Sequence, residues 1–128
     1  MKRFFPLIVI FFASVAFSQT AGKAIPAYSV NDKLIGLSNL TDGLSECPVR
    51  SASGKIKDID RLGNTVEIRI KIDKKTSAKA IIPLDRVSAD ERKPLFKHLI
   101  TKNNIVRVAG YGCDAEMPFT AFSVDRVY

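Results

Sequence analysis

Side chains that usually build metal centres and nucleophilic catalytic sites are scarce in this chain. Its 128 residues include one histidine, two cysteines, two methionines and no tryptophan. So few soft or imidazole donors disfavour a copper-type site, and a cysteine nucleophile would have only His98 as its base. Glycine and proline are also sparse, at 7 and 6 residues, which excludes collagen-like and low-complexity architectures. We therefore expect no catalytic residue, no metal and no cofactor.

The N-terminal segment has the layout of a secretory signal peptide. Two basic residues, Lys2 and Arg3, precede an apolar run over residues 4–17, and small residues precede an expected cleavage after Ser18. The run is shorter than the roughly 20 residues that cross a bilayer as a helix. We predict a signal peptide over residues 1–18 and a periplasmic or secreted mature protein without a transmembrane segment.

Export gives the cysteine count a structural meaning, because paired cysteines in an oxidising compartment usually form a disulfide. Cys47 and Cys113 are the two cysteines of the chain. We predict that they are bonded to each other. Closing a loop of this length contributes about 4 kcal/mol in the chain-entropy model.

Alternating apolar and polar residues predict strands through most of the chain after residue 48. The predicted strands are residues 49–59, 65–73, 78–84, 105–111 and 119–127. The clearest alternation places four apolar side chains on one face of the second strand: Val66, Ile68, Ile70 and Ile72. In the first strand, Ile56 and Ile59 have opposite parity, which predicts a bulge or bend near Lys57 and Asp58.

One helix is predicted between the third and fourth of these strands. Ser88 and Glu91 have the spacing of a capping box. The apolar side chains that follow form a single stripe: Leu95, Phe96, Leu99 and Ile100. Because proline is tolerated only in the first turn of a helix, Pro94 predicts that the regular helix begins near Arg92.

Residues 19–48 are predicted to form an N-terminal extension. Asp32 is a suitable N-cap for a short helix, in which the leucines recur near helical spacing: Leu34, Leu37, Leu40 and Leu44.

Three strands, a helix and two strands, with a bent first strand, make up the order of an OB-fold. The predicted fold is therefore mainly β, a five-stranded Greek-key barrel over residues 49–128 with one helix between strands three and four. Three segments, at residues 53–56, 106–110 and 121–127, resemble those of small exported bacterial OB-fold proteins. The resemblance implies the fold, and its motifs are structural rather than catalytic.

Basic side chains gather on the outward face of the predicted three-strand meander. The candidate ligand-binding face consists of Lys55, Lys57, Arg69, Lys71 and Lys79. OB-folds commonly bind oligonucleotides or oligosaccharides on this face. An outward strand face is also polar merely because it meets solvent, and Glu67 dilutes the positive charge. No aromatic residue lies between Lys55 and Lys79 to stack on bases, which disfavours nucleic acid.

These features favour an exported, non-enzymatic OB-fold binding or accessory protein of the bacterial envelope. Its partner would be an anionic ligand or an envelope protein, because the net charge of the chain is +7. A periplasmic inhibitor or immunity protein that blocks a hydrolase fits the size, export and disulfide as an alternative. A third candidate is a glycan-binding subunit similar to the B subunits of AB5 toxins, which are exported OB-fold proteins with a disulfide.

Overall fold

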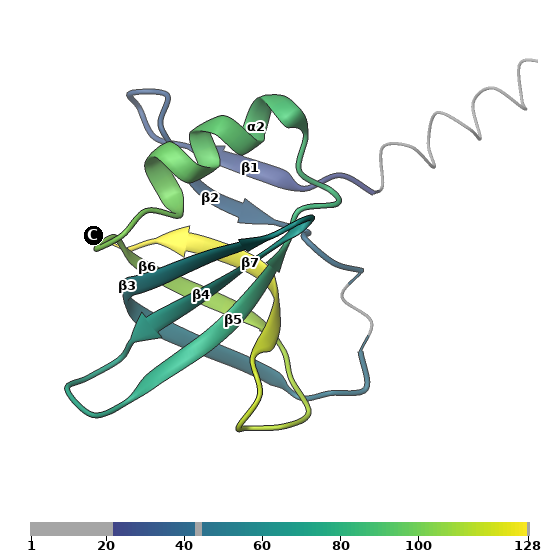
Figure 1. Ribbon diagram of the computed structural model, residues 1–128. Helices are drawn as coiled ribbons and strands as arrows, with labels where there is room; N and C mark the ends of the chain where they lie inside the picture. The colour runs from purple at the N-terminus through teal and green to yellow at the C-terminus, as the bar shows by residue number, and fades with distance from the viewer. Residues whose placement is uncertain (1–21, 43–44, 128) are drawn as a thin grey trace, which may run out of the picture.

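The structure is a computed structural model, and it describes residues 22–42 and 45–127 (Figure 1). The predicted signal peptide lies outside the described residues. Within them the fold is mainly β, with seven strands in a single sheet and one short helix. The strands are β1 (Ile25–Tyr28), β2 (Leu34–Ser38), β3 (Val49–Leu62), β4 (Thr65–Lys71), β5 (Ser77–Pro83), β6 (Ile105–Tyr111) and β7 (Phe119–Arg126). Helix α2 (Ala89–Pro94) continues directly into a π-helical turn, η1 (Leu95–Leu99).

Five of the strands are linked in a closed circuit of pairings. β3 pairs antiparallel with both β4 and β6, β4 pairs antiparallel with β5, and β7 pairs parallel with β5 and antiparallel with β6. β2 adds to β7, and β1 forms the outer edge beside β2. α2 and η1 lie at one end of this circuit, and the β4–β5 turn projects from the opposite end (Figure 1).

β3 is long enough to pair with two neighbours because it bends. Its residues 49–55 face β6 and its residues 55–62 face β4. Gly54 lies at the change of partner, where a Cβ would stand 2.2 Å from the carbonyl oxygen of Lys71, so a larger residue would push the strands apart. The register shifts between Ile56 and Asp58, which confirms the predicted bulge.

The predicted inward face of β4 is confirmed for three of its four residues. Val66, Ile68 and Ile70 are completely buried. The prediction that Ile72 shares this buried face is wrong, because β4 ends at Lys71 and Ile72 is 46% exposed in the following turn. The alternation of apolar and polar residues continues in the sequence beyond Lys71, where β4 ends and its inward face is no longer covered.

The capping box at the start of the helix is confirmed, but the helix begins earlier than predicted. The Ser88 side chain accepts from the backbone N–H of Glu91, and α2 starts at Ala89 rather than near Arg92. Pro94 is the last residue of α2 instead of lying in its first turn. Proline has no N–H to continue the α-helical ladder, and the next turn is a π-helix that buries Leu95 and Leu99.

The short helix predicted after Asp32 is also wrong, since this segment forms the β1–β2 hairpin. Asp32 has a positive φ of 60° in the hairpin turn, where the Ser29 hydroxyl accepts from the backbone N–H of Lys33 at 3.2 Å. Three of the leucines at helical spacing are nevertheless buried, with Leu34 and Leu37 in β2 facing the core. The leucine at position 44 lies outside the described residues. Pairing with β7 and burial of the leucines, rather than the spacing of the leucines along the chain, therefore determine that this segment is a strand.

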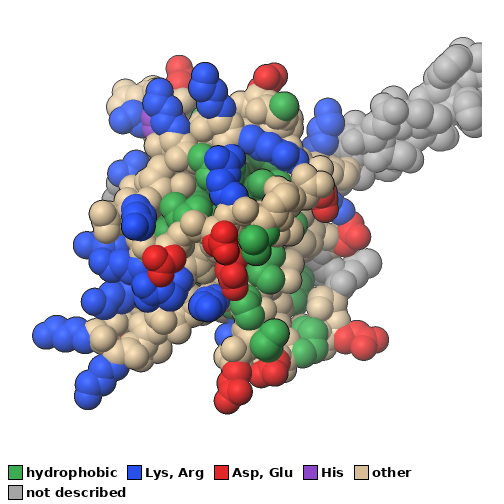
Figure 2. All heavy atoms as spheres, in the orientation of Figure 1, with side chains coloured by type: hydrophobic (Ala, Val, Ile, Leu, Met, Phe, Trp, Pro, Cys, Tyr) green, Lys and Arg blue, Asp and Glu red, His purple; other side chains and the backbone are tan. Residues whose placement is uncertain are grey.

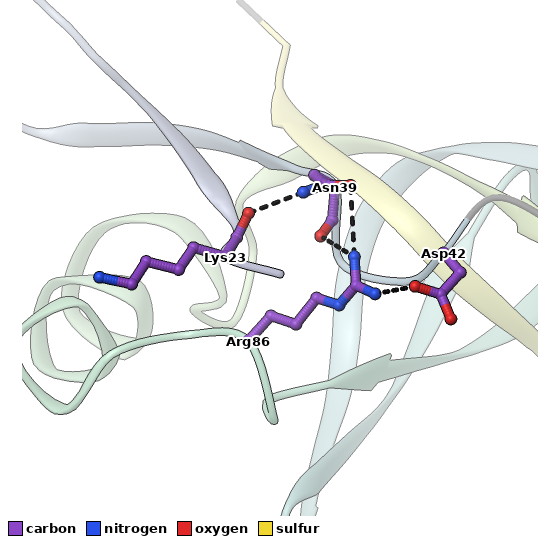
Figure 3. Close-up of polar contacts among 4 residues, drawn as sticks. All are labelled: Lys23, Asn39, Asp42 and Arg86. Atoms are coloured by element: carbon purple, nitrogen blue, oxygen red, sulfur yellow. Dashed lines mark hydrogen bonds and ion pairs between the residues drawn. The ribbon is translucent and has the colours of Figure 1, made fainter. Parts of the chain in front are cut away.

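A single arginine ties the hairpin to the segment between β5 and α2 (Figure 3). The Arg86 guanidinium donates to the main-chain and side-chain oxygens of Asn39 at 3.4 and 3.3 Å, and it also forms an ion pair with Asp42. The Asn39 amide in turn donates to the carbonyl oxygen of Lys23 at 2.7 Å. The hairpin is thus held by β7 on one side and by Arg86 on the other.

Candidate functional site

The turn between β4 and β5 is shaped by one aspartate. Oδ1 of Asp73 accepts from the backbone N–H groups of Lys75 and Thr76, both at 2.8 Å. These hydrogen bonds, the one from Lys75 first, hold the pKa of the Asp73 carboxyl below its ordinary value of 3.8. The backbone N–H of Ile72 donates to the carbonyl of Thr76 at 3.0 Å and closes the turn. Two successive lysines, at positions 74 and 75, are therefore presented on a preformed turn.

A shallow hollow of about 310 Å³ opens beside this turn. We call it the basic hollow, and its lining residues are Lys57, Arg69, Lys71, Asp73, Lys74, Lys75, Thr76 and Ser77. Lys and Arg side chains gather over this turn at the lower left of Figure 2. Asp73 is the one carboxylate among these lining residues, and it is engaged with the turn backbone. The hollow therefore presents an excess of positive charge.

Three of the five predicted site residues line the basic hollow, and the other two lie next to it. Lys57, the extra residue of the β3 bulge, lines it together with Arg69 and Lys71. Lys55 is the cross-strand partner of Lys71 on β3. Lys79 is the cross-strand partner of Arg69 on β5. The strand register thus brings all five basic residues onto one outward surface.

Acidic residues limit the basic surface on its other side. Nε of Arg69 lies 2.6 Å from Oδ2 of Asp58, so part of its positive charge is offset within the protein. A second hollow, of about 200 Å³, lies beside this ion pair and is lined by Asp58, Asp60, Glu67, Ile68, Arg69 and Lys79. Positive charge is therefore concentrated at the β4–β5 turn and does not extend over the whole meander.

Sequence reasoning missed Lys74 and Lys75 as site residues, because they were assigned only to a connecting turn. The signal was present in the adjacent lysines that join two strands with basic outward positions. These two lysines can be assigned to the site only because the structure shows that Asp73 folds the turn beside Lys57.

The loop over residues 112–118 between β6 and β7 is a second preformed feature. The predicted disulfide is confirmed, with Cys47 and Cys113 bonded and their Cα atoms 4.6 Å apart. Arg50 on β3 donates to the carbonyl oxygens of three loop residues at 2.9, 3.0 and 3.3 Å: Asp114, Met117 and Ala115. Its guanidinium also lies 5.1 Å from the centre of the Phe119 ring. Sequence reasoning did not identify Arg50, because its acceptors are backbone atoms more than sixty residues away.

Neither a metal centre nor a membrane-spanning helix is present among the described residues, and no protein-family model matches the chain. Across residues 22–42 and 45–127, histidine, cysteine, aspartate and glutamate side chains form no group of three or more that could hold a metal ion. No helix in this part of the chain has the length and apolar character needed to cross a membrane. No protein-family model matches the chain, and no curated protein matches its sequence. Its function must therefore be inferred from the site.

Proposed function

We propose that this chain is an exported, non-enzymatic OB-fold binding protein of the bacterial envelope, and that its basic hollow binds an anionic ligand. The observation that carries the proposal is the convergence of five basic side chains on one hollow that holds a single, internally engaged carboxylate: Lys57, Arg69, Lys71, Lys74 and Lys75. Such a surface attracts anions over a Debye length of about 8 Å at physiological ionic strength.

The OB-fold assignment is supported by the circuit of pairings. Its order is β3, β4, β5, β7, β6, and the helix lies between β5 and β6. OB-folds bind ligands across the face of their second and third strands, which here would be β4 and β5. The basic hollow lies on that face and at the turn that joins these two strands.

Export is supported by the N-terminal sequence pattern and is compatible with the disulfide. Residues 4–17 are apolar and follow two basic residues. Disulfides persist in oxidising compartments, and Cys47 is bonded to Cys113.

A second candidate function, inhibition of a hydrolase, is favoured by the loop over residues 112–118. The disulfide and Arg50 hold this loop, and it exposes Asp114, Glu116 and 60% of Met117. Acidic side chains gather near it at the bottom of Figure 2. A rigid acidic loop with an apolar tip would bind a positively charged enzyme cleft without a large ordering cost. A stoichiometric complex with an envelope hydrolase that is lost in Met117→Glu would favour this function.

Binding to heparin, a soluble anionic polymer, tests the main proposal. We define the turn variant as Lys71→Gln with Lys75→Gln, and the helix variant as Lys97→Gln with Lys102→Gln. All four lysines are exposed, so the two variants lose the same charge at different places. We expect the turn variant to bind heparin about tenfold more weakly than the unsubstituted protein does. The helix variant should lose less than about threefold in heparin affinity. Equal losses would mean that net charge alone attracts the polymer, and would contradict a site at the basic hollow.

A further inference from the structure

An isoleucine is exposed at the base of the basic turn, where β4 ends. Ile72 follows the last residue of β4 and is 46% exposed. It is adjacent in the chain to Lys71 and lies two residues before Lys74. The turn projects from the end of the strand circuit and carries protruding basic side chains (Figures 1 and 2). An apolar side chain in the middle of lysines on a projecting turn is poorly suited to bulk water.

A second isoleucine extends this combination across the sheet. Ile105 on β6 is 45% exposed and is the cross-strand partner of Lys55, which in turn pairs with Lys71. The outward surface beside the turn therefore carries an exposed apolar side chain, Ile105, next to Lys55 and Lys71.

We propose that the β4–β5 turn docks onto the surface of an anionic lipid bilayer, with its lysines among the headgroups and Ile72 in the interface. This inference rests on the proposed anion-binding function and names its ligand. Basic residues near an anionic leaflet each contribute to attachment, and stable attachment generally needs an apolar contact in addition to charge. The turn supplies both kinds of contact.

The arrangement of the hollow fits a lipid surface better than a compact anion or a soluble polymer. The guanidinium that could hold a small anion in a bidentate manner belongs to Arg69, which is already paired with Asp58 at 2.6 Å. Between Lys55 and Lys79 the sequence has no aromatic ring on which a base or a sugar could stack. Several lysines beside an exposed isoleucine match a surface that is both anionic and apolar.

The turn is also ordered before it meets a partner. Asp73 holds the backbone of Lys75 and Thr76, and Thr76 holds Ile72. Docking would therefore require little ordering of the main chain, which favours binding.

A tryptophan placed at residue 72 tests the proposal, because the chain has no tryptophan of its own. The exported protein is prepared as Ile72→Trp and, as a matched control, as Leu62→Trp. Leu62 is 54% exposed, is the last residue of β3 and pairs with Thr65 at the opposite end of β4. Each protein is mixed with vesicles of phosphatidylcholine and phosphatidylglycerol, or of phosphatidylcholine alone. We expect a blue shift of the emission for Ile72→Trp with anionic vesicles only. No shift at residue 72, or equal shifts at residues 62 and 72, would overturn the proposal.

Two further variants separate this inference from the proposed function on which it rests. We expect the turn variant to bind anionic vesicles ~30-fold more weakly, because each lysine near an anionic surface contributes about 1 kcal/mol. Ile72→Ala should weaken vesicle binding roughly fivefold and leave heparin binding unchanged, since only the bilayer offers an apolar phase. Heparin binding without vesicle binding would overturn lipid docking and leave the anion site standing. If the turn variant keeps both heparin binding and vesicle binding, lipid docking and the anion site are both overturned. All variants have the same N-terminus, so differences in binding among them arise from the substituted residues.

Discussion

Replacing Arg50 by methionine tests whether one side chain shapes the loop over residues 112–118. Methionine is close in length to the aliphatic stem of arginine but donates no hydrogen bond. The change removes three donations to loop carbonyls at 2.9, 3.0 and 3.3 Å and a contact with the Phe119 ring at 5.1 Å. A hydrogen bond from a charged group contributes about 1.5–3 kcal/mol.

The loop carbonyls are near solvent, so water replaces part of what the guanidinium supplies. We therefore expect the substitution to lower the free energy of unfolding by about 2–4 kcal/mol, below the sum for three buried charged bonds. Urea denaturation should show a lower midpoint with an unchanged slope, because the same surface is exposed on unfolding. Exchange of the Met117 amide, which donates to the carbonyl of Asp114 at 3.2 Å, should accelerate.

The control is Arg107→Met on the neighbouring strand β6. The Arg107 side chain is 65% exposed, and its contact with Asp125 is 3.9 Å long. Its removal should change the free energy of unfolding by no more than about 0.5 kcal/mol. Equal effects of the two substitutions would refute the reasoning that Arg50 holds the loop.

Three other predictions concern the core, the turn and the processed chain. Ile68→Ala should cost about 2–5 kcal/mol of stability, against at most about 1 kcal/mol for Arg69→Ala, and equal thermal shifts would contradict the face assignment. Asp73→Ala should lower the melting temperature near neutral pH. Because the folded pKa of Asp73 is depressed, its contribution is present above 3.8 and is lost as the pH falls below this value, so the difference between the two proteins should narrow there. Intact-mass analysis of the exported protein should give an N-terminus at Gln19, and thiol labelling without reduction should give no product.

Local patterns in the sequence predicted the parts of the fold that depend on local geometry. Strict alternation identified the buried side chains of β4, and the parity change at Ile56 located the bulge, because each follows from the two-residue period of a strand. Serine and glutamate three positions apart predicted the capping box, because both partners lie within one helical turn, although the helix itself begins at Ala89 and not near Arg92 as predicted. The even cysteine count predicted the disulfide through chemistry rather than geometry.

Features that depend on distant partners could not be predicted in this way. Leu34 and Leu37 fit a helix as well as a strand, and their pairing partner β7 lies at the other end of the chain. Pro94 was assigned to a first turn because a switch to a π-helix leaves no pattern in the sequence. In the candidate site, the outward basic residues followed from alternation, whereas Lys74 and Lys75 belong to it only because Asp73 folds the turn.

Mapping of a bound anion onto the backbone amides tests the central claim most directly. The isotopically labelled exported protein would be titrated with a short heparin oligosaccharide while its amide resonances are followed by NMR. We expect chemical-shift changes to be largest at Lys57, Lys71 and residues 74–77, and to disappear in the turn variant. Changes of equal size at Lys97 and Lys102, or changes confined to residues 112–118, would contradict an anion site at the basic hollow.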